Sequence, residues 1–290
     1  MPFFSIILPT YNRAHQIRTT IEHVLSQDFD DFELIVVDDG SKDNTEKEIR
    51  GFSDPRIQYR FKKNEERAIA RNTGIRMASG DYVTFLDSDD ELYSNCLSTA
   101  LELCQENNYP AWMHLNYEIK DQSGRVLKEA PERKGDLVKQ LVTGNHLSCL
   151  GVFVKKEILD KEKFDEDPRL IGSEDYDLWL RIAKKFPLSY SNEVVAAIIQ
   201  HRDRSVLGFS GEKLVARINY LVQKHQKLGT FGNKDYCTFV ANRYMYLALH
   251  LSILRNLRRS AYYILKALIT KPIVIISKKF LGIIKTFLIK

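Results

Sequence analysis

The sequence predicts an α/β fold in which a largely parallel sheet is covered by helices on both faces. Through the first 90 residues, short and almost wholly apolar runs of strand length alternate with segments of helical periodicity. Strands without a polar face are typical of parallel sheets that are buried on both sides. The composition, 44% hydrophobic and 28% charged, is that of a globular protein, which excludes a wholly disordered or multi-span membrane chain.

The elements of this sheet follow one another at regular spacing. Right-handed crossovers bring the carboxyl ends of such strands to one edge of the sheet, where open α/β sheets bind ligands. Strands are expected at Phe3–Leu8, Phe32–Val37, Ile57–Phe61 and Tyr82–Leu86, with helices at His15–Gln27, Asn44–Gly51 and Glu66–Ala78 between them.

A second group of elements extends this domain. From about Gly211 onward only helical patterns occur. We therefore expect a sheet domain over residues 1–210 and a helical extension over residues 211–290. The sheet domain is expected to continue with a helix near Ser94–Asn107, a hairpin of Trp112–Ile119 and Val126–Lys128, strands at Gly151–Lys155 and Val194–Gln200, and a helix around Tyr176–Lys185.

Charge divides the chain unevenly. The segment from Tyr236 to Lys290 contains ten Lys and Arg residues and no acidic residue, whereas the preceding part carries a net charge of −5. A cationic end of this kind predicts an anionic partner. The N-terminus lacks the basic region of a signal peptide, and no run of 18 apolar residues predicts a transmembrane helix. The four cysteines lack metal-site or disulfide-framework spacing, as expected for reduced thiols in the cytosol.

Acidic residues gather where two predicted strands end. Asp38 and Asp39 follow the second strand, and the segment Asp87–Glu91 follows the fourth. Like charges a few Å apart repel by about 1 kcal/mol in water and several times more near a protein surface. The Asp87–Glu91 segment is therefore either a solvated turn before the next helix, or a site for a hard cation such as Mg²⁺ or Mn²⁺ that also binds a diphosphate. Arg67 and Arg71, one helical turn apart, either form a solvated basic face or contact those phosphates.

A second acidic cluster, far away in the sequence, begins a helix. Ser173 can cap this helix, and the helix dipole favours Glu174 and Asp175 in its first turn without any catalytic role. That explanation does not extend to Asp177, and a carboxylate at a helix start is also a suitable general base. His201 ends a later strand beside Arg202 and Arg204, which fits either a surface histidine or a contact to phosphate or metal.

Together these landmarks resemble the family 2 glycosyltransferases of the GT-A fold, over about residues 3–205. Each motif is weak alone, but their common order and spacing are specific. The resemblance implies a GT-A type, Rossmann-like mixed sheet flanked by helices, with a C-terminal helical extension. The motifs are Pro9-Thr10-Tyr11-Asn12-Arg13, Val36-Val37-Asp38-Asp39-Gly40-Ser41, Arg71-Asn72-Thr73-Gly74-Ile75, Phe85-Leu86-Asp87-Ser88-Asp89-Asp90-Glu91 and Glu174-Asp175-Tyr176-Asp177.

The resemblance also implies roles for single residues. Asp87-Ser88-Asp89 stands at the Asp-x-Asp motif, so Asp89 is implied to bind the metal that bridges the diphosphate, with Asp87 near the ribose or the metal. Asp39 is implied to accept a hydrogen bond from the base, and His201 to touch the diphosphate or complete the metal shell. Asp175 occupies the position of the catalytic base. The nucleotide-sugar site is implied to include Pro9, Thr10, Tyr11, Arg13, Asp38, Arg67, Arg71, Asn72 and Ser88, and acceptor contacts are expected at Glu174 and Trp179.

The implied function is an inverting, metal-dependent transfer of a sugar from a nucleotide-sugar, with UDP preferred, to a hydroxyl of a saccharide or lipid-linked acceptor in surface polysaccharide or glycolipid synthesis. Mn²⁺ or Mg²⁺ would act as Lewis acid on the departing diphosphate. Two alternatives are open from the sequence. A sugar nucleotidyltransferase would need a Gly-rich phosphate loop after the first strand, which Pro9-Thr10-Tyr11-Asn12 does not provide. The other alternative is a non-catalytic, nucleotide-sugar-binding membrane scaffold.

The basic tail, residues 261–290, has the pattern of an amphipathic helix. Lys271, Lys278 and Lys285 share one side, opposite an apolar stripe that includes Ile276 and Ile283. This pattern predicts a helix at an anionic membrane surface, and the alternative is a helix docked on the protein or on another subunit. Nucleic acid is not an expected partner, because Ile and Leu dominate where stacking aromatics would be needed. The expected location is cytoplasmic, peripheral on the inner face of the cell membrane.

Overall fold

The computed structural model describes residues 1–201 and 210–288, in two compact units. Unit 1 comprises Met1–Gly135, Leu147–Glu166 and Lys185–Arg204, and unit 2 comprises Asp136–His146, Asp167–Lys184 and Ser205–Lys290. The units thus interleave along the chain, and a catalytic domain that ends at residue 210 stays a prediction. Arg202 and Arg204, expected beside His201, lie outside the described residues, as do the last two residues of the basic tail.

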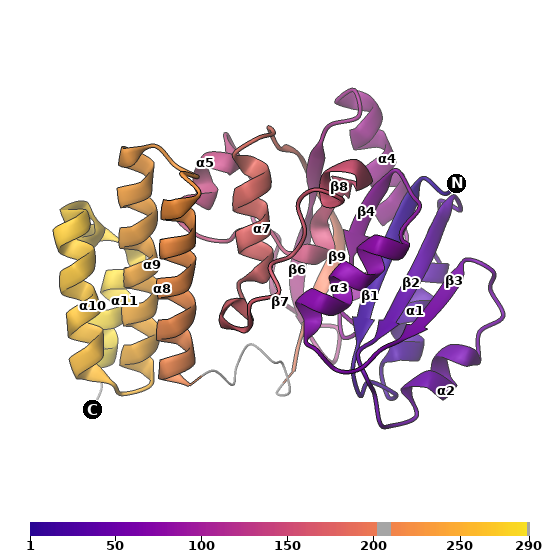
Figure 1. The fold of residues 1–290 in the computed structure, drawn as a ribbon, viewed down its shortest axis with the longest axis horizontal. Helices are drawn as coiled ribbons and strands as arrows, with labels where there is room; N and C mark the ends of the chain where they lie inside the picture. Colours follow the sequence, from indigo (N-terminus) through magenta and orange to yellow (C-terminus); the bar gives the residue numbers. More distant parts are fainter. Residues whose placement is uncertain (202–209, 289–290) are drawn as a thin grey trace. The chain divides into compact units, whose positions relative to one another are not determined.

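Unit 1 is built on a mixed sheet in the order β3-β2-β1-β4-β8-β6-β9-β5, with β7 paired to β6 (Figure 1). Strands β1 to β4 are parallel, whereas β8 runs antiparallel to both β4 and β6. The predicted GT-A type mixed sheet is therefore confirmed. The strands are β1 Phe4–Thr10, β2 Phe32–Asp38, β3 Ile57–Phe61, β4 Tyr82–Phe85, β5 Glu91–Leu92, β6 Trp112–Asp121, β7 Val126–Lys128, β8 Val152–Lys155 and β9 Ser189–Gln200.

Helices cover both faces of this sheet. Side chains along β1 alternate between the two faces, and all of them are buried. Ile6 and Leu8 point into a core that includes α1 (Ile17–Leu25) and α4 (Cys96–Glu106). On the other face, Ile7 meets α3 (Arg67–Met77) at Gly74, where an added Cβ would lie 2.4 Å from Cγ2 of Ile7. The remaining helices of unit 1 are α2 Thr45–Arg50, η1 Cys149–Gly151 and α6 Lys156–Leu159.

The strand register sets the position of the polar residues. Thr10 pairs with Asp38 across β1 and β2, and Asp38 pairs with Phe61 across β2 and β3. On the other side of β1, Ile7 pairs with Phe85, so the Asp87–Glu91 segment follows β4 at the level where β1 ends. The carboxyl ends of three parallel strands therefore present their polar residues at one edge of the sheet, as the sequence predicts.

Unit 2 is helical, and α9 is its central element. Helices α8, α10 and α11 all contact α9 (Figure 1). The α9 side chains Leu247, Ala248 and Leu251 are buried. No helix in the described part of the chain is long and apolar enough to cross a membrane. The elements are α5 Leu137–Leu141, η2 Pro168–Leu170, α7 Glu174–Ala183, α8 Gly211–Lys227, α9 Asn233–Ile253, α10 Leu257–Thr270, η4 Pro272–Ile276 and α11 Lys278–Leu288.

The apolar residues of the predicted amphipathic tail are partly buried and partly exposed. Ile283 of α11 is buried, and the Thr286 hydroxyl donates to Oγ of Ser252 in α9 at 2.7 Å. This side of α11 is docked within unit 2, which is the alternative noted above. Ile276 and Ile284 are exposed. Membrane contact by the tail remains a prediction, and it now concerns the exposed residues alone.

Candidate active site

The two carboxylates that follow β2 have different surroundings. Asp38 is fully buried, and its oxygens accept hydrogen bonds from the Ser41 amide at 2.8 Å and the Tyr59 hydroxyl at 3.0 Å. Burial, together with the bond to Asp38, raises the pKa of Tyr59. In Asp39, Oδ1 accepts from Nζ of Lys62 at 2.6 Å and from the Glu65 amide at 3.0 Å. Asp38 thus holds the turn, and Asp39 is an ion-paired carboxylate at the sheet edge.

The acidic segment after β4 is engaged by three basic side chains. Nη2 of Arg71 lies 2.6 Å from Oδ1 of Asp87, and Arg71 itself is almost fully buried. Oδ2 of Asp89 lies 2.9 Å from Nε2 of His201 and 3.2 Å from Nη2 of Arg13. The structure therefore brings together residues that follow β1, β4 and β9 and a residue of α3, all of them expected in one site. A cavity of about 320 Å³ also borders Asp89 and is lined further by His15, Thr19, Asp121 and Gln122.

Other predicted nucleotide contacts lie along the same edge. The hydroxyl of Thr10 is buried, and no described residue forms a hydrogen bond with it. Tyr11 is exposed, whereas Pro9 and Ser88 are buried, and Arg67 is the first residue of α3. The expected contacts at Thr10 and Tyr11 thus differ in exposure, and the hydroxyl oxygen of Thr10 has almost no accessible surface.

Asn72 was also expected at the nucleotide, but its amide serves the protein. Its Nδ2 donates to the Phe164 carbonyl at 2.9 Å and to Glu166 at 2.8 Å, while its Oδ1 accepts from the Phe164 amide at 3.0 Å. These bonds tie α3 to the segment that follows α6. The side chain of Asn72 therefore has a structural role in this unit.

Asp175 lies in unit 2, at the start of α7. Its Oδ2 accepts from Nδ2 of Asn145 at 2.8 Å, and its Oδ1 accepts from the Tyr176 amide at 2.7 Å. Both oxygens are therefore oriented by hydrogen bonds that favour the ionised form, which is the form a general base needs.

Asp177, which capping did not explain, belongs to a buried ion cluster. Its side chain is fully buried, 2.7 Å from Nζ of Lys224, 3.0 Å from Nε of Arg181 and 3.2 Å from Nε2 of His225. Burial alone would raise the pKa of Asp177, but His225 and the charges of Arg181 and Lys224 outweigh burial and lower this pKa to about 2. Burial also lowers the pKa of His225. Asp177 therefore joins α7 to α8 and is not a candidate base.

The two expected acceptor contacts are both buried. Glu174 accepts a hydrogen bond from the Gly172 amide at 2.6 Å, and Trp179 is fully inside the core. Such positions do not favour contact with an acceptor, so the two roles stay predictions without structural support.

Some residues of the site were not singled out in the sequence. Lys62, the partner of Asp39, directly follows β3, and the rule that polar residues at strand ends share one edge would have found it. Asn145 lies in a loop, and nothing in the pattern of a single sequence distinguishes it.

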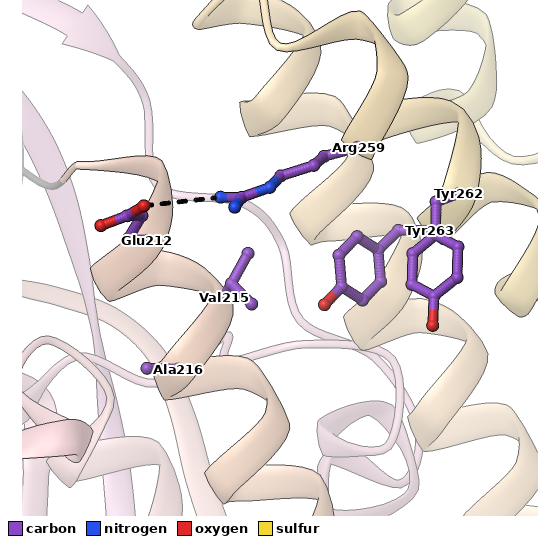
Figure 2. A pocket seen from close by; sticks show the side chains of 6 residues that line it. All are labelled: Glu212, Val215, Ala216, Arg259, Tyr262 and Tyr263. Atoms are coloured by element: carbon purple, nitrogen blue, oxygen red, sulfur yellow. Dashed lines mark ion pairs between the residues drawn. The ribbon is translucent and has the colours of Figure 1, made fainter.

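A second cavity, of about 480 Å³, lies between α8 and α10 (Figure 2). An ion pair of 4.0 Å between Arg259 and Glu212 spans its mouth, and the rings of Tyr262 and Tyr263 stand on the α10 side. None of the predicted site residues lines this cavity.

The mixed sheet, with acidic and basic residues converging at the ends of its parallel strands, defines a glycosyltransferase of the GT-A fold class. Residues 5–160 match the family model described as glycosyl transferase family 2. The chain belongs to this family and is a transferase enzyme, which confirms the resemblance seen in the motifs.

Named relatives and a solved structure agree with this assignment. An Escherichia coli protein, the UDP-Glc:alpha-D-GlcNAc-diphosphoundecaprenol beta-1,3-glucosyltransferase WfgD, is 35% identical over 75% of this chain and 90% of that protein. A Campylobacter jejuni GalNAc(5)-diNAcBac-PP-undecaprenol beta-1,3-glucosyltransferase is 30% identical over 93% of this chain and 90% of that protein. An uncharacterized glycosyltransferase of Rickettsia bellii is 35% identical over 62% of this chain, which spans only 26% of that protein. The fold is similar to that of S. aureus TarS 1-349 in complex with UDP-GlcNAc, with a TM-score of 0.64, 17% identity and coverage of 92% of this chain and 89% of that one.

Proposed function

We propose that this enzyme transfers a sugar, with inversion, from a UDP-sugar to a hydroxyl of a saccharide carried on a polyprenyl diphosphate. Two relatives that the chain covers almost completely are named as glucosyltransferases for undecaprenol-diphosphate-linked acceptors. UDP-glucose is an α-glycoside, and the beta-1,3 linkage in the name of the E. coli relative describes an inverted product. Family membership favours this function over the two alternatives left open by the sequence.

The observation that carries the proposal is the set of charged contacts at the carboxyl edge of the sheet. Arg13 and Arg71 lie against Asp89 and Asp87, so cationic side chains stand where a diphosphate would need them. Asp39, which directly follows β2, offers a carboxylate oxygen to a base edge. A carboxylate can accept from the N3–H of uracil.

The residues also fit a divalent cation. Among the described residues, no group of three or more His, Cys, Asp or Glu side chains is arranged to hold an ion. Asp89 and His201 lie within 2.9 Å of each other, however, and Mg²⁺ or Mn²⁺ commonly takes one or two protein ligands and completes its shell with phosphates and water. Asp89 and His201 would hold the ion, with Asp87 near it. When bound, the ion would offset the charge that grows on the leaving diphosphate.

Asp175 is the proposed general base. It would remove the proton from the acceptor hydroxyl as that oxygen attacks the anomeric carbon, and the bond to the diphosphate breaks in the same displacement. Asn145 and the Tyr176 amide orient the carboxylate for this step.

The assay uses radiolabelled UDP-glucose, a synthetic polyprenyl-diphosphate-linked GlcNAc acceptor and Mn²⁺, with and without EDTA. The wild type should form a labelled lipid product that is lost in EDTA. Asp89→Asn and Asp175→Asn should each lower turnover at least 100-fold, whereas Asp235→Asn, an exposed carboxylate of α9, should not. Full activity of Asp175→Asn would refute the base, and undiminished turnover in EDTA would refute metal dependence. A panel of other nucleotide-sugars tests the donor.

We also propose that unit 2 contacts the cytoplasmic surface of an anionic membrane. Between residues 236 and 290 there is no acidic residue, and the large apolar side chains here are unusually exposed, to 75% for Ile269 and 73% for Ile276. Exposed apolar side chains among lysines and arginines are typical of proteins that bind anionic lipid surfaces. Within the basic tail, residues 261–290, the exposed apolar residues are Tyr262, Leu265, Ile269, Ile273, Ile275, Ile276, Leu281 and Ile284.

A further inference from the structure

We infer that the C-terminal helix α11 positions the catalytic carboxylate. Lys279 of α11 and Arg243 of α9 hold the loop that follows α5, residues 142–146, and Asn145 of this loop orients Asp175. This inference rests on the proposed function, in which Asp175 is the general base. All the residues involved lie in unit 2. Lys279, Arg243 and Asn145 are positioning residues, since none of them is proposed to touch the substrate.

The first step is the contact between the loop and the base. Nδ2 of Asn145 donates to Oδ2 of Asp175 at 2.8 Å. The same loop is tied to α7 a second time, because the Tyr176 hydroxyl donates to the carbonyl of Leu141 at the end of α5. The loop therefore determines where one carboxylate oxygen of Asp175 points.

The second step is what holds the loop. The carbonyl of Thr143 accepts from Nη2 of Arg243 at 2.7 Å and from Nζ of Lys279 at 3.1 Å. These donors come from two helices, α9 and α11, and Lys279 also lies 3.4 Å from Oδ1 of Asn242. Hydrogen bonds from charged donors are stronger than neutral ones, so one carbonyl oxygen receives two strong restraints.

The electrostatic cost of this arrangement argues for a role beyond packing. Arg243 is buried over the ring of Tyr176, 5.0 Å from its centroid. Burial, and then the charge of Arg243, lower the pKa of Lys279 to about 8. Arg243 is buried and Lys279 is half-buried, so their like charges repel each other, and an apolar residue would dock α11 at lower cost. The cost is explained if the loop must be held in one conformation.

The position of α11 adds a consequence. On one side this helix presents the exposed residues Leu281 and Ile284, and elsewhere Lys279 reaches the loop. Docking of α11 should therefore matter for turnover and not for donor binding, because the residues proposed to bind the donor belong to unit 1.

The test compares the full-length variants Asn145→Ala and Lys279→Met with Lys227→Met, which removes an exposed lysine at the end of α8, also in unit 2. We expect Asn145→Ala and Lys279→Met to lower kcat about tenfold, to leave the KM for the donor unchanged, and to move the acid limb of the kcat–pH profile to higher pH. The limb moves because the ionised form of Asp175 loses support. Lys279→Arg should restore kcat, and Lys227→Met should match the wild type.

The pH limb is the decisive readout, because a merely structural defect would lower kcat without moving it. Arg217 of α8, which also interacts electrostatically with Asp175, is unchanged in every variant. Asn145→Ala changes a loop residue and leaves α9 and α11 intact. It therefore still tests the inference if Lys279→Met does not fold. Wild-type kcat and pH limb in Asn145→Ala and Lys279→Met, with Asp175→Asn inactive, would overturn the inference and leave the base standing. Full activity of Asp175→Asn would overturn the proposed base, and the inference with it.

Discussion

Nε2 of His201 lies 2.9 Å from Oδ2 of Asp89, although 112 positions separate the two residues in the sequence. The end of β9 is held against the segment after β4 by a further contact, in which Oδ1 of Asp90 accepts from the Ile199 amide at 3.0 Å. The neighbouring residues Asp89 and Asp90 thus have different roles. Asp90 fixes the backbone, and Asp89 meets the imidazole.

Replacement of His201 tests whether this contact serves metal binding. His201→Ala should lower kcat/KM about 10–100-fold and raise the Mn²⁺ concentration needed for half-maximal rate, because one proposed ligand is lost. The measurement is initial rate against Mn²⁺ concentration. An unchanged Mn²⁺ dependence in His201→Ala would show that His201 is not a ligand.

Asp177→Asn should have a lower free energy of unfolding than the wild type, while the folded fraction of the variant should keep its turnover. Removing one member of a buried ion cluster typically costs about 3–5 kcal/mol, because the remaining charges lose their partner. Urea denaturation gives the free energy of unfolding. Asp175→Asn should differ from the wild type by less than about 1 kcal/mol while losing turnover. Equal stability of Asp177→Asn and the wild type would contradict the structural role.

Because of Asp177, the stability of the folded protein should decrease at low pH. The pKa of Asp177 is about 2 in the folded protein, below the ordinary value of 3.8 that applies in the unfolded chain. The ionised carboxylate therefore stabilises the fold fully above about pH 4, and this contribution is lost as the pH falls through about 2. The difference in unfolding free energy between the wild type and Asp177→Asn should shrink from pH 5 to pH 2.5. A constant difference over that range would disprove the shift.

Gly74→Ala tests the close approach of α3 to the sheet. The added methyl would lie 2.4 Å from Cγ2 and 3.0 Å from Cγ1 of Ile7, so the buried strand or the helix must shift. Overpacking of this kind costs about 1–3 kcal/mol. Gly232→Ala is the control, because nothing lies within 4 Å of its Cβ position. Thermal and urea unfolding should separate the two variants, and a neutral Gly74→Ala would mean that α3 can move away without cost.

Membrane contact is tested with the exposed isoleucines. Ile269→Glu combined with Ile276→Glu should reduce co-sedimentation with phosphatidylglycerol vesicles by tenfold or more, since burying one such side chain contributes about 1.5–3 kcal/mol. Leu127→Glu, at an exposed apolar position in β7 of unit 1, should bind like the wild type. Wild-type binding should also weaken as salt is added. Equal binding by the double variant and the wild type would exclude this surface.

Much of unit 1 could be predicted from local patterns. Apolar runs located β1 to β4, and the rule for parallel strands placed Asp38, Asp87 and Asp89 at one edge before any coordinates. These features are predictable because strand burial and crossover handedness depend on short segments and general sterics. Asn72 was expected at the nucleotide because it is adjacent to Arg71 in the same motif, yet its amide holds the segment around Phe164, about 90 residues away.

The linear pattern was enough to determine the fold class, the family motifs and the acidic strand ends, because each depends on residue type and spacing within a few turns of chain. Tertiary structure alone decided the roles of Asp177, Asn145 and Ile283. Asp177 has a structural role because it contacts Lys224 and His225 of α8. Ile283 is buried because α11 packs on α9. A carboxylate or an isoleucine has the same side chain in either role, and only the groups that the fold brings within a few Å decide between them.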